Sequence, residues 1–201
     1  MTKYGDRLRS EDYSVETVSV KEGLSLIGQY HYAKGGSHTA VFMHGLICNW
    51  TGRIEGVVQW LPPTKPTAIS VAGEKWRDCL SLSRMVVIPS APKNSCSFLM
   101  AKSIQTIKAE GRWKILVTYA DTRVGHSGLV YRASGWTYFG ISSKTTAWID
   151  PKTGKQVATL STKSRSKQQM VELGYVQVGK FYKHKFVKYL DKALHRHYCE
   201  L

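Results

Sequence analysis

A polar run between a hydrophobic strand and a helix is the first place in this sequence where chemistry can be expected. Residues 82–88 are mostly apolar and rich in β-branched side chains, which predicts a strand covered on both faces. Pro89 and Pro92 end the strand, and Asn94 or Ser95 can cap the helix that follows. The first turn of that helix would offer free N–H groups and a positive dipole end to a phosphate. The alternative is an ordinary strand, loop and helix in a core.

Two other polar positions fall at the ends of predicted elements. A capping-box pattern at Ser19 predicts a helix that ends in HYAKGG, so His31 and Tyr32 lie before a glycine pair that could hold the chain close to a ligand. A histidine there can equally be a cation favoured by the helix dipole. Asp121 follows the buried strand predicted at residues 114–119, at the strand end where open α/β sheets place ligands.

The remaining elements follow from hydrophobic periods and turn residues. They are a strand at 13–20, a hairpin at 39–47 and 53–61, a long loop at 62–78, a short helix at 127–133, a strand at 136–141, a hairpin at 145–161 and a polar helix ended by Gly174. This mixture predicts an α/β (α+β) fold with a mixed central sheet flanked by helices. A chain of 201 residues is sufficient for one such domain at 1–201.

The charge of the chain points to a polyanionic partner. The sequence has 29 Lys and Arg against 14 Asp and Glu, a formal net charge of +15. Residues 152–201 interleave aromatic residues with 11 Lys and Arg and only 3 acidic residues, which predicts a basic C-terminal extension that contacts nucleic acid. A solvated basic face, an acidic protein and an anionic membrane are the alternatives. The candidate phosphate contacts are Lys180, Lys183, Lys185 and Lys188.

The sequence carries no sign of export or of a metal-binding cysteine motif. No apolar run approaches about 18 residues, and the N-terminus lacks the apolar core of a signal peptide, so we expect a cytoplasmic protein without a membrane partner. The four cysteines are scattered without a C-x-x-C pair, which argues against a zinc knuckle or a disulfide framework.

The order of the predicted elements resembles the acetyltransferase fold of the GNAT superfamily. That resemblance implies an acyl-CoA such as acetyl-CoA as a small-molecule group donor, with its pyrophosphate bound where the central strand meets its helix. It also implies that a tyrosine on the next short helix, Tyr131 in LVYRASGW, protonates the departing thiolate. The residues implied at the pyrophosphate are Arg84, Lys93, Asn94, Ser95 and Ser97.

Several residue runs resemble a narrower group, the Mom family of bacteriophage DNA modification proteins. They are YHY at 30–32, LSRMVV at 82–87, TYAD at 118–121, GHSG at 125–128, VYRA at 130–133 and KHKF at 183–186, in the family's order. Mom-like proteins are GNAT-related, convert adenine in duplex DNA to an N6-carbamoylmethyl form and protect phage DNA from host restriction. The resemblance therefore implies double-stranded DNA as the substrate, and also Fe(II), because the family is described as iron-dependent.

Carried over residue by residue, the resemblance implies a catalytic centre of His31, Tyr32 and Asp121 with Arg84 beside them. His31, Asp121 and His126 would be the iron ligands. A target adenine inside a duplex must be flipped out of the stack before it can react, and Tyr32 could stack against it.

Two other functions remain open from the sequence. A GNAT-like acyltransferase acting on tRNA or protein would have the same fold and charge. A DNA-binding protein without catalysis would also keep both features. The oligomeric state is open as well, with a homodimer as one option, and the sequence does not identify the group donor.

Overall fold

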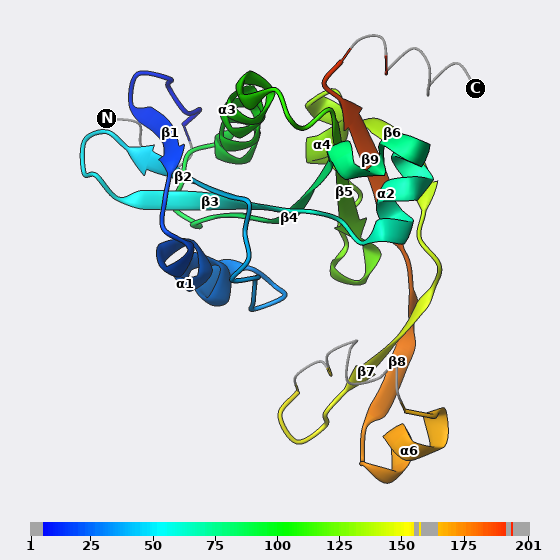
Figure 1. The fold of residues 1–201 in the computed structure, drawn as a ribbon. Helices are drawn as coiled ribbons and strands as arrows, with labels where there is room; N and C mark the ends of the chain where they lie inside the picture. Colours follow the sequence, from blue (N-terminus) through cyan, green and yellow to red (C-terminus); the bar gives the residue numbers. More distant parts are fainter. Residues whose placement is uncertain (1–5, 155–156, 158–164, 192–193, 195–201) are drawn as a thin grey trace. The chain divides into compact units, whose positions relative to one another are not determined.

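The computed structural model describes residues 6–154, 157, 165–191 and 194. Two compact units make up the chain (Figure 1). The first unit is drawn from Met1–Tyr119, Gly128–Phe139 and Phe186–Leu201, and the second from Ala120–Ser127 and Gly140–Lys185. The expectation of a single domain at 1–201, with a basic part at 152–201, stays a prediction. Within the described part of the chain, none of the helices combines the length and apolarity needed to cross a bilayer.

A seven-stranded mixed sheet, most of whose residues belong to the first unit, has the strand order β1-β2-β3-β4-β5-β9-β6 (Figure 1). Strands β1 to β4 pair antiparallel in chain order, whereas β4 and β5 pair parallel. The strands are β1 (Tyr13–Thr17), β2 (Phe42–Cys48), β3 (Ile54–Leu61), β4 (Cys79–Val87), β5 (Ile115–Asp121), β6 (Thr137–Ile141) and β9 (Lys183–Tyr189).

Helices α1 (Val20–Tyr30) and α3 (Ser95–Glu110) cover opposite faces of this sheet. Successive side chains of a strand point to opposite faces. On β2, Met43 belongs to the core cluster that includes Ile27 of α1, and the next residue, His44, bonds Ser103 of α3. Ser19 and Glu22 form the predicted capping box at the start of α1.

His44 and Ser103 belong to a buried polar group between β2, β3 and α3. The Ser103 oxygen lies 2.6 Å from Nδ1 of His44 and accepts a hydrogen bond of 2.7 Å from the indole N–H of Trp60. All three residues are almost fully buried. Burial lowers the pKa of His44, so unfolding in acid takes up a proton, and the stability contributed here should fall as pH drops below about 6.5.

Ser103→Ala should reduce the free energy of unfolding by about 1–3 kcal/mol, because two buried ring nitrogens then lose their partner. Urea denaturation measures this change. Ser25→Ala, on the exposed face of α1, is the matched control and should stay within about 0.5 kcal/mol of the parent. Equal effects of the two substitutions would show that the buried group contributes little.

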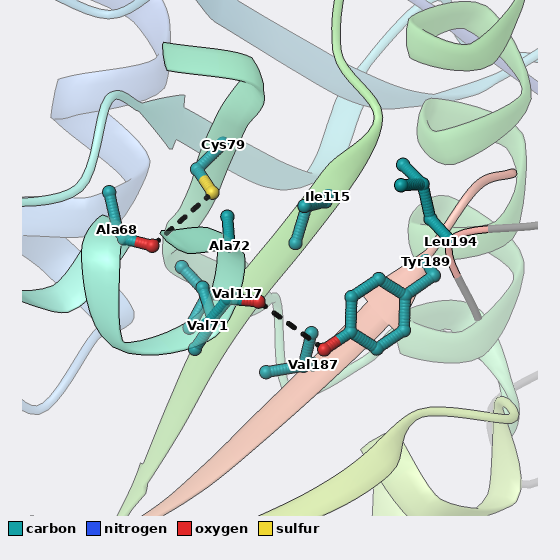
Figure 2. Packing of buried hydrophobic residues seen from close by; sticks show 9 residues of the cluster. All are labelled: Ala68, Val71, Ala72, Cys79, Ile115, Val117, Val187, Tyr189 and Leu194. Carbon is teal, nitrogen blue, oxygen red and sulfur yellow. Dashed lines mark hydrogen bonds between the residues drawn. The ribbon is translucent and has the colours of Figure 1, made fainter. Parts of the chain in front are cut away.

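The predicted loop at residues 62–78 is wrong. It contains α2 (Lys65–Ala72) and the 3-10 helix η1 (Gly73–Asp78). A proline in the first turn of α2 does not break the helix, because the N–H it lacks would have no intrahelical acceptor there. Ala68, Val71 and Ala72 of α2 pack on residues of β4, β5 and β9, and the Tyr189 hydroxyl donates to the Val71 carbonyl at 3.3 Å (Figure 2).

The second unit is built on a two-stranded antiparallel ribbon of β7 (Thr145–Ile149) and β8 (Val176–Phe181), with α6 (Lys167–Glu172) before β8 (Figure 1). The predicted polar helix is confirmed, with Ser166 as its N-cap. β7 pairs with β8, which the sequence analysis did not predict. The Val157 N–H also donates to the Trp148 carbonyl at 3.0 Å, as the hairpin predicted at 145–161 requires. Residues 155–156 and 158–161 of that hairpin lie outside the described residues. The second unit also contains the short 3-10 helix η2 (Thr122–Val124), which precedes β7 in the chain.

Candidate active site

The parallel strands β4 and β5 separate in the middle of the sheet. Their pairing ends at Leu82 with Thr118, and beyond that point the register of β4 continues only with β3. Side chains bond the carbonyls there: Thr118 Oγ1 donates to Leu82 at 3.2 Å and Arg84 Nη1 donates to Ser83 at 2.7 Å. Beyond this separation, β4 leads into the turn before α3, where the sequence analysis predicted that a ligand binds.

The turn before α3 bends on a residue with left-handed backbone geometry. Asn94 is the N-cap of α3 with φ 70° and ψ 3°, and its side chain makes no capping hydrogen bond. Glycine adopts this geometry freely and asparagine tolerates it, so Asn94 shapes a turn in a segment that contains no glycine. The Ser95 N–H donates to the Pro92 carbonyl at 3.3 Å, whereas the next N–H groups of the first turn, those of Cys96 and Ser97, have no acceptor within the helix and are suited to an anion.

The other residues predicted around this turn have different surroundings. Ser95 is buried, and its hydroxyl donates to the Pro92 carbonyl at 2.7 Å, which fixes the turn rather than facing a ligand. The Lys93 backbone bonds the N-terminal segment through Asp6 and Leu8, and its side chain is exposed. Ser97 is half-buried in the first turn of α3.

Tyr131 lies on α4 (Leu129–Ala133) among aromatic rings of the first unit. Its ring centroid is 5.7 Å from that of Trp136 and 5.4 Å from that of Phe186. Burial raises the pKa of its hydroxyl, an effect that a hydrogen bond with the Thr118 side chain opposes. Tyr131 is thus linked to the residue at which β4 and β5 separate, and its hydroxyl keeps its proton at neutral pH.

His31 and Tyr32 end α1 with their rings stacked, 4.4 Å between centroids. His31 is buried, whereas Tyr32 is 39% exposed. The Ala33 N–H donates to Nδ1 of His31 at 3.1 Å, so Nδ1 carries a lone pair and Nε2 of the neutral ring carries the proton. The imidazole therefore carries its N–H at Nε2.

The loop that follows His31 is fixed from the sheet by two neighbouring side chains. Gln59 of β3 is fully buried and makes a reciprocal pair with Ser37: its oxygen accepts from the Ser37 N–H at 3.2 Å and its amide donates to the Ser37 carbonyl at 2.7 Å. Its cross-strand partner Arg84 donates through Nε to the Gly35 carbonyl at 2.7 Å. A Cβ at Gly36 would lie 2.8 Å from the Gln59 oxygen, so any larger residue there would have to displace the Gln59 amide.

Gln59→Leu should loosen this loop while keeping the volume of the core. Amide hydrogen exchange across residues 33–39 should quicken by roughly tenfold or more, because both hydrogen bonds to Ser37 are lost. Hydrogen-exchange mass spectrometry measures the rate. Gln105→Leu, on the exposed face of α3, should leave exchange in the loop unchanged. Unchanged exchange in the Gln59 variant would mean that the loop is held by other contacts.

Asp121 belongs to the second unit, as the last residue of β5 and the N-cap of η2. One carboxylate oxygen accepts from the Arg123 N–H at 3.0 Å, and the other lies 3.3 Å from Arg123 Nη2 and 3.5 Å from Lys183 Nζ. Two cations and one N–H donor thus surround a buried carboxylate. His126 is exposed nearby in sequence, and its N–H donates to the Asp121 carbonyl. The grouping of Asp121 with His31 and Tyr32 stays a prediction.

The four lysines predicted to bind DNA have unequal surroundings. Lys180 is exposed on β8, and Lys183 is exposed and paired with Asp121. Burial lowers the pKa of both Lys185 and Lys188. Lys188 Nζ donates to two carbonyls at the end of α4, those of Ser134 at 2.9 Å and Gly135 at 3.0 Å, which gives it a structural role.

Comparison with known protein families identifies the family to which this chain belongs. Residues 12–200 match the family described as the Mom protein family. The chain belongs to the Mom protein family. A curated relative of the family, "Methylcarbamoylase mom" of Escherichia phage Mu, is 25% identical over 194 residues, covering 91% of this chain and 78% of that protein. The predicted family is therefore confirmed.

Solved structures confirm the predicted GNAT-like fold for this Mom-family chain. An acetyltransferase of the GNAT family from Streptococcus pneumoniae superposes with a TM-score of 0.53 at 13% identity, covering 88% of this chain and 99% of that chain. A ribosomal-protein-S5-alanine acetyltransferase from Vibrio fischeri superposes with a TM-score of 0.54 at 12% identity, covering 92% and 97%. At these identities the likeness concerns the fold alone.

The residues expected to bind Fe(II) do not fit an iron centre as they are arranged. Nδ1 of His31 already accepts the Ala33 N–H, and Nε2 carries the ring proton, so neither nitrogen offers a lone pair without a rearrangement. The Asp121 carboxylate is paired with Arg123 and Lys183. Across the part of the chain that the structure describes, no three His, Cys, Asp or Glu side chains gather as a metal-binding group. The iron expectation thus finds no support.

Two residues of the candidate site were not predicted by the sequence analysis. Gln59 is a polar residue in the middle of the apolar run VVQWL, and such an interruption of a buried strand is a signal that could have identified it. Thr118 is the last residue of β5 that pairs with β4, and its role depends on the place where the two strands separate, which no local pattern contains.

Proposed function

We propose that this chain is a transferase that modifies adenine at N6 in duplex DNA with a carbamoylmethyl-type group, and so protects phage DNA from host restriction. The match of residues 12–200 to the Mom protein family is the observation that carries the proposal. The name of its phage Mu relative, a methylcarbamoylase, agrees with this transferase class. The net charge of +15 suits a polyanionic substrate.

In this proposal the group donor is an acyl-CoA-like molecule whose pyrophosphate lies at the first turn of α3. The left-handed Asn94 turn, the first-turn N–H groups and the exposed Lys93 support that assignment. Arg84 has its guanidinium on the carbonyls of Gly35 and Ser83, so we assign it to positioning the site rather than to a donor phosphate.

Tyr131 is proposed to be the general acid that protonates the leaving thiolate. Its hydroxyl is protonated at neutral pH, as a proton donor must be, and it is hydrogen-bonded to Thr118 where β4 and β5 separate. Transfer of a plain acetyl group would bond N6 to a carbonyl carbon, whereas a carbamoylmethyl product bonds N6 to a methylene carbon. Simple acetyl transfer is therefore insufficient for the product.

His31 and Tyr32 are proposed to meet the adenine. The stacked pair offers an exposed aromatic face for a flipped base and an N–H donor at Nε2 of His31 for an acceptor atom of base or donor. Because Nδ1 of His31 already accepts a hydrogen bond, we assign His31 to holding the adenine rather than to taking the proton from its N6 amine.

Restriction digestion tests the proposal. Plasmid DNA from cells that express the chain should resist endonucleases whose sites contain adenine, and should be cut normally by endonucleases whose sites contain only G·C pairs. Complete cleavage together with a newly modified tRNA or protein would favour the acyltransferase alternative. Complete cleavage with no modified product, but with retained DNA affinity, would favour a DNA-binding protein without catalysis.

A further inference from the structure

Most of the second unit lies, in sequence, between two neighbouring strands of the main sheet. Strands β6 and β9 are neighbours in that sheet, yet β6 ends at Ile141 and β9 begins at Lys183. Two neighbouring antiparallel strands need only a tight turn to connect them. Instead, the chain between them forms a separate ribbon, β7 and β8, with α6 (Figure 1). A segment of this size that the main sheet does not require for its connection is available for binding.

Exposed apolar side chains lie close together in sequence on α6, on the residue that ends it and on β8. They are Val171 (58% exposed), Leu173 (53%), Val176 (52%) and Val178 (43%). Other apolar residues of the same unit, Ala147, Trp148 and Met170, are buried, so the unit has an inner side of its own. Exposed apolar residues in such a cluster indicate a surface that binds a partner.

The charge of the second unit identifies the kind of partner. Its described residues include eight cations and three acidic residues. A second copy of the chain would bring like charges together, which opposes a self-association through this surface. Duplex DNA supplies the opposite charge. The cations are Arg123, Lys144, Lys152, Arg165, Lys167, Lys180, Lys183 and Lys185, and the acidic residues are Asp121, Asp150 and Glu172.

We propose that the β7–β8 ribbon enters the major groove of duplex DNA, with Val176 and Val178 against base edges and Lys167 and Lys180 on the flanking phosphates. The major groove admits a two-stranded β-ribbon, and apolar side chains contact the thymine methyl group there. The N6 amine of adenine also lies on the major-groove edge. The inference rests on the proposed function for its duplex DNA partner and adds the element that reads the groove.

Fluorescence anisotropy with a labelled duplex, measured at several salt concentrations on the full chain, tests the ribbon. The double variant Val176→Thr and Val178→Thr keeps β-branched side chains, so the strand should fold. It should bind specific DNA about tenfold more weakly with an unchanged salt dependence. Lys167→Gln with Lys180→Gln should instead reduce the slope of log affinity against log salt by about 2. Ile69→Thr, an exposed apolar position on α2, is the matched control and should change neither quantity.

Unchanged DNA affinity in the valine double variant, with circular dichroism matching the parent, would overturn the proposal. If sedimentation showed that this variant alters the oligomeric mass while DNA affinity stays the same, a second copy would be the occupant of the surface, which also overturns it. The assay measures binding and no modification. Loss of affinity in these variants, together with no modified adenine in cells that express the parent chain, would therefore refute the proposed function while supporting DNA as the partner of the ribbon.

Discussion

Tyr131→Phe should lower DNA modification by about 100-fold or more while the protein stays folded. Proton transfer by a positioned side chain contributes roughly 10²–10⁴-fold to a rate, and this substitution removes only the hydroxyl that would donate the proton. The ring contacts with Trp136 and Phe186 remain. Burial raises the pKa of the hydroxyl, so the parent should keep its activity into alkaline pH and lose it only when the tyrosine ionises.

Tyr138→Phe is a matched control for this prediction. Tyr138 also packs against Phe186, with ring centroids 5.5 Å apart, but its side chain is 41% exposed. The control should modify DNA nearly as well as the parent. Normal modification by Tyr131→Phe would remove Tyr131 from the chemistry, and equal losses in the two variants would point to packing around Phe186 instead.

Substitution of His31 should have the second large effect, again about 100-fold or more on modification. Two variants separate the roles of the ring nitrogens. His31→Asn retains an acceptor close to the place of Nδ1, where the Ala33 N–H donates, but offers nothing at Nε2. His31→Gln reaches the place of Nε2 with an amide donor and loses the Nδ1 contact.

The proposed role of His31 as an N–H donor predicts that His31→Asn is folded and inactive. His31→Gln should regain part of the activity, which can be measured as modified nucleoside per total adenine, and thermal unfolding of both variants provides the control. Full activity of His31→Asn would show that His31 only shapes the turn after α1. Loss of folding in both variants would give the residue a structural role.

Local signals in the sequence predicted much of the fold. The capping box at Ser19 and Glu22 gave the start of α1 to the residue, and turn residues gave the hairpin of β2 and β3. The strand and helix around residues 82–107 were predicted as well, although β4 begins at Cys79, three residues earlier than expected. Each of these features depends on side chains within a few positions of one another, which is why the sequence contains them.

Features that depend on distant parts of the chain were predicted less well. Pro66 favoured a loop at 62–78, but tertiary burial of α2 against β4, β5 and β9 outweighed the weak local preference. Strand β8, which pairs with β7, lies beyond α6 in the chain, and no short-range pattern in the sequence predicts the pairing of β7 with β8.

The candidate site shows the same division. The strand–helix turn of Asn94, the short helix of Tyr131 and the end of α1 at His31 were all located from local patterns and the family resemblance. The connection of the loop after His31 to Gln59 and Arg84 was not, because those bonds join residues 22 to 49 positions apart. The catalytic roles assigned to these residues remain predictions that the variants above test.

Mass spectrometry of nucleosides is the most direct measurement of the central claim, that this chain hypermodifies adenine in DNA. DNA from cells that express the parent, Tyr131→Phe or Tyr138→Phe is digested to nucleosides and compared with DNA from cells without the gene. We predict a new deoxyadenosine derivative, heavier by a carbamoylmethyl-type group, in the parent and Tyr138→Phe samples and nearly none in Tyr131→Phe. Unmodified deoxyadenosine in every sample, with the parent protein folded and abundant in the cells, would contradict the proposed function.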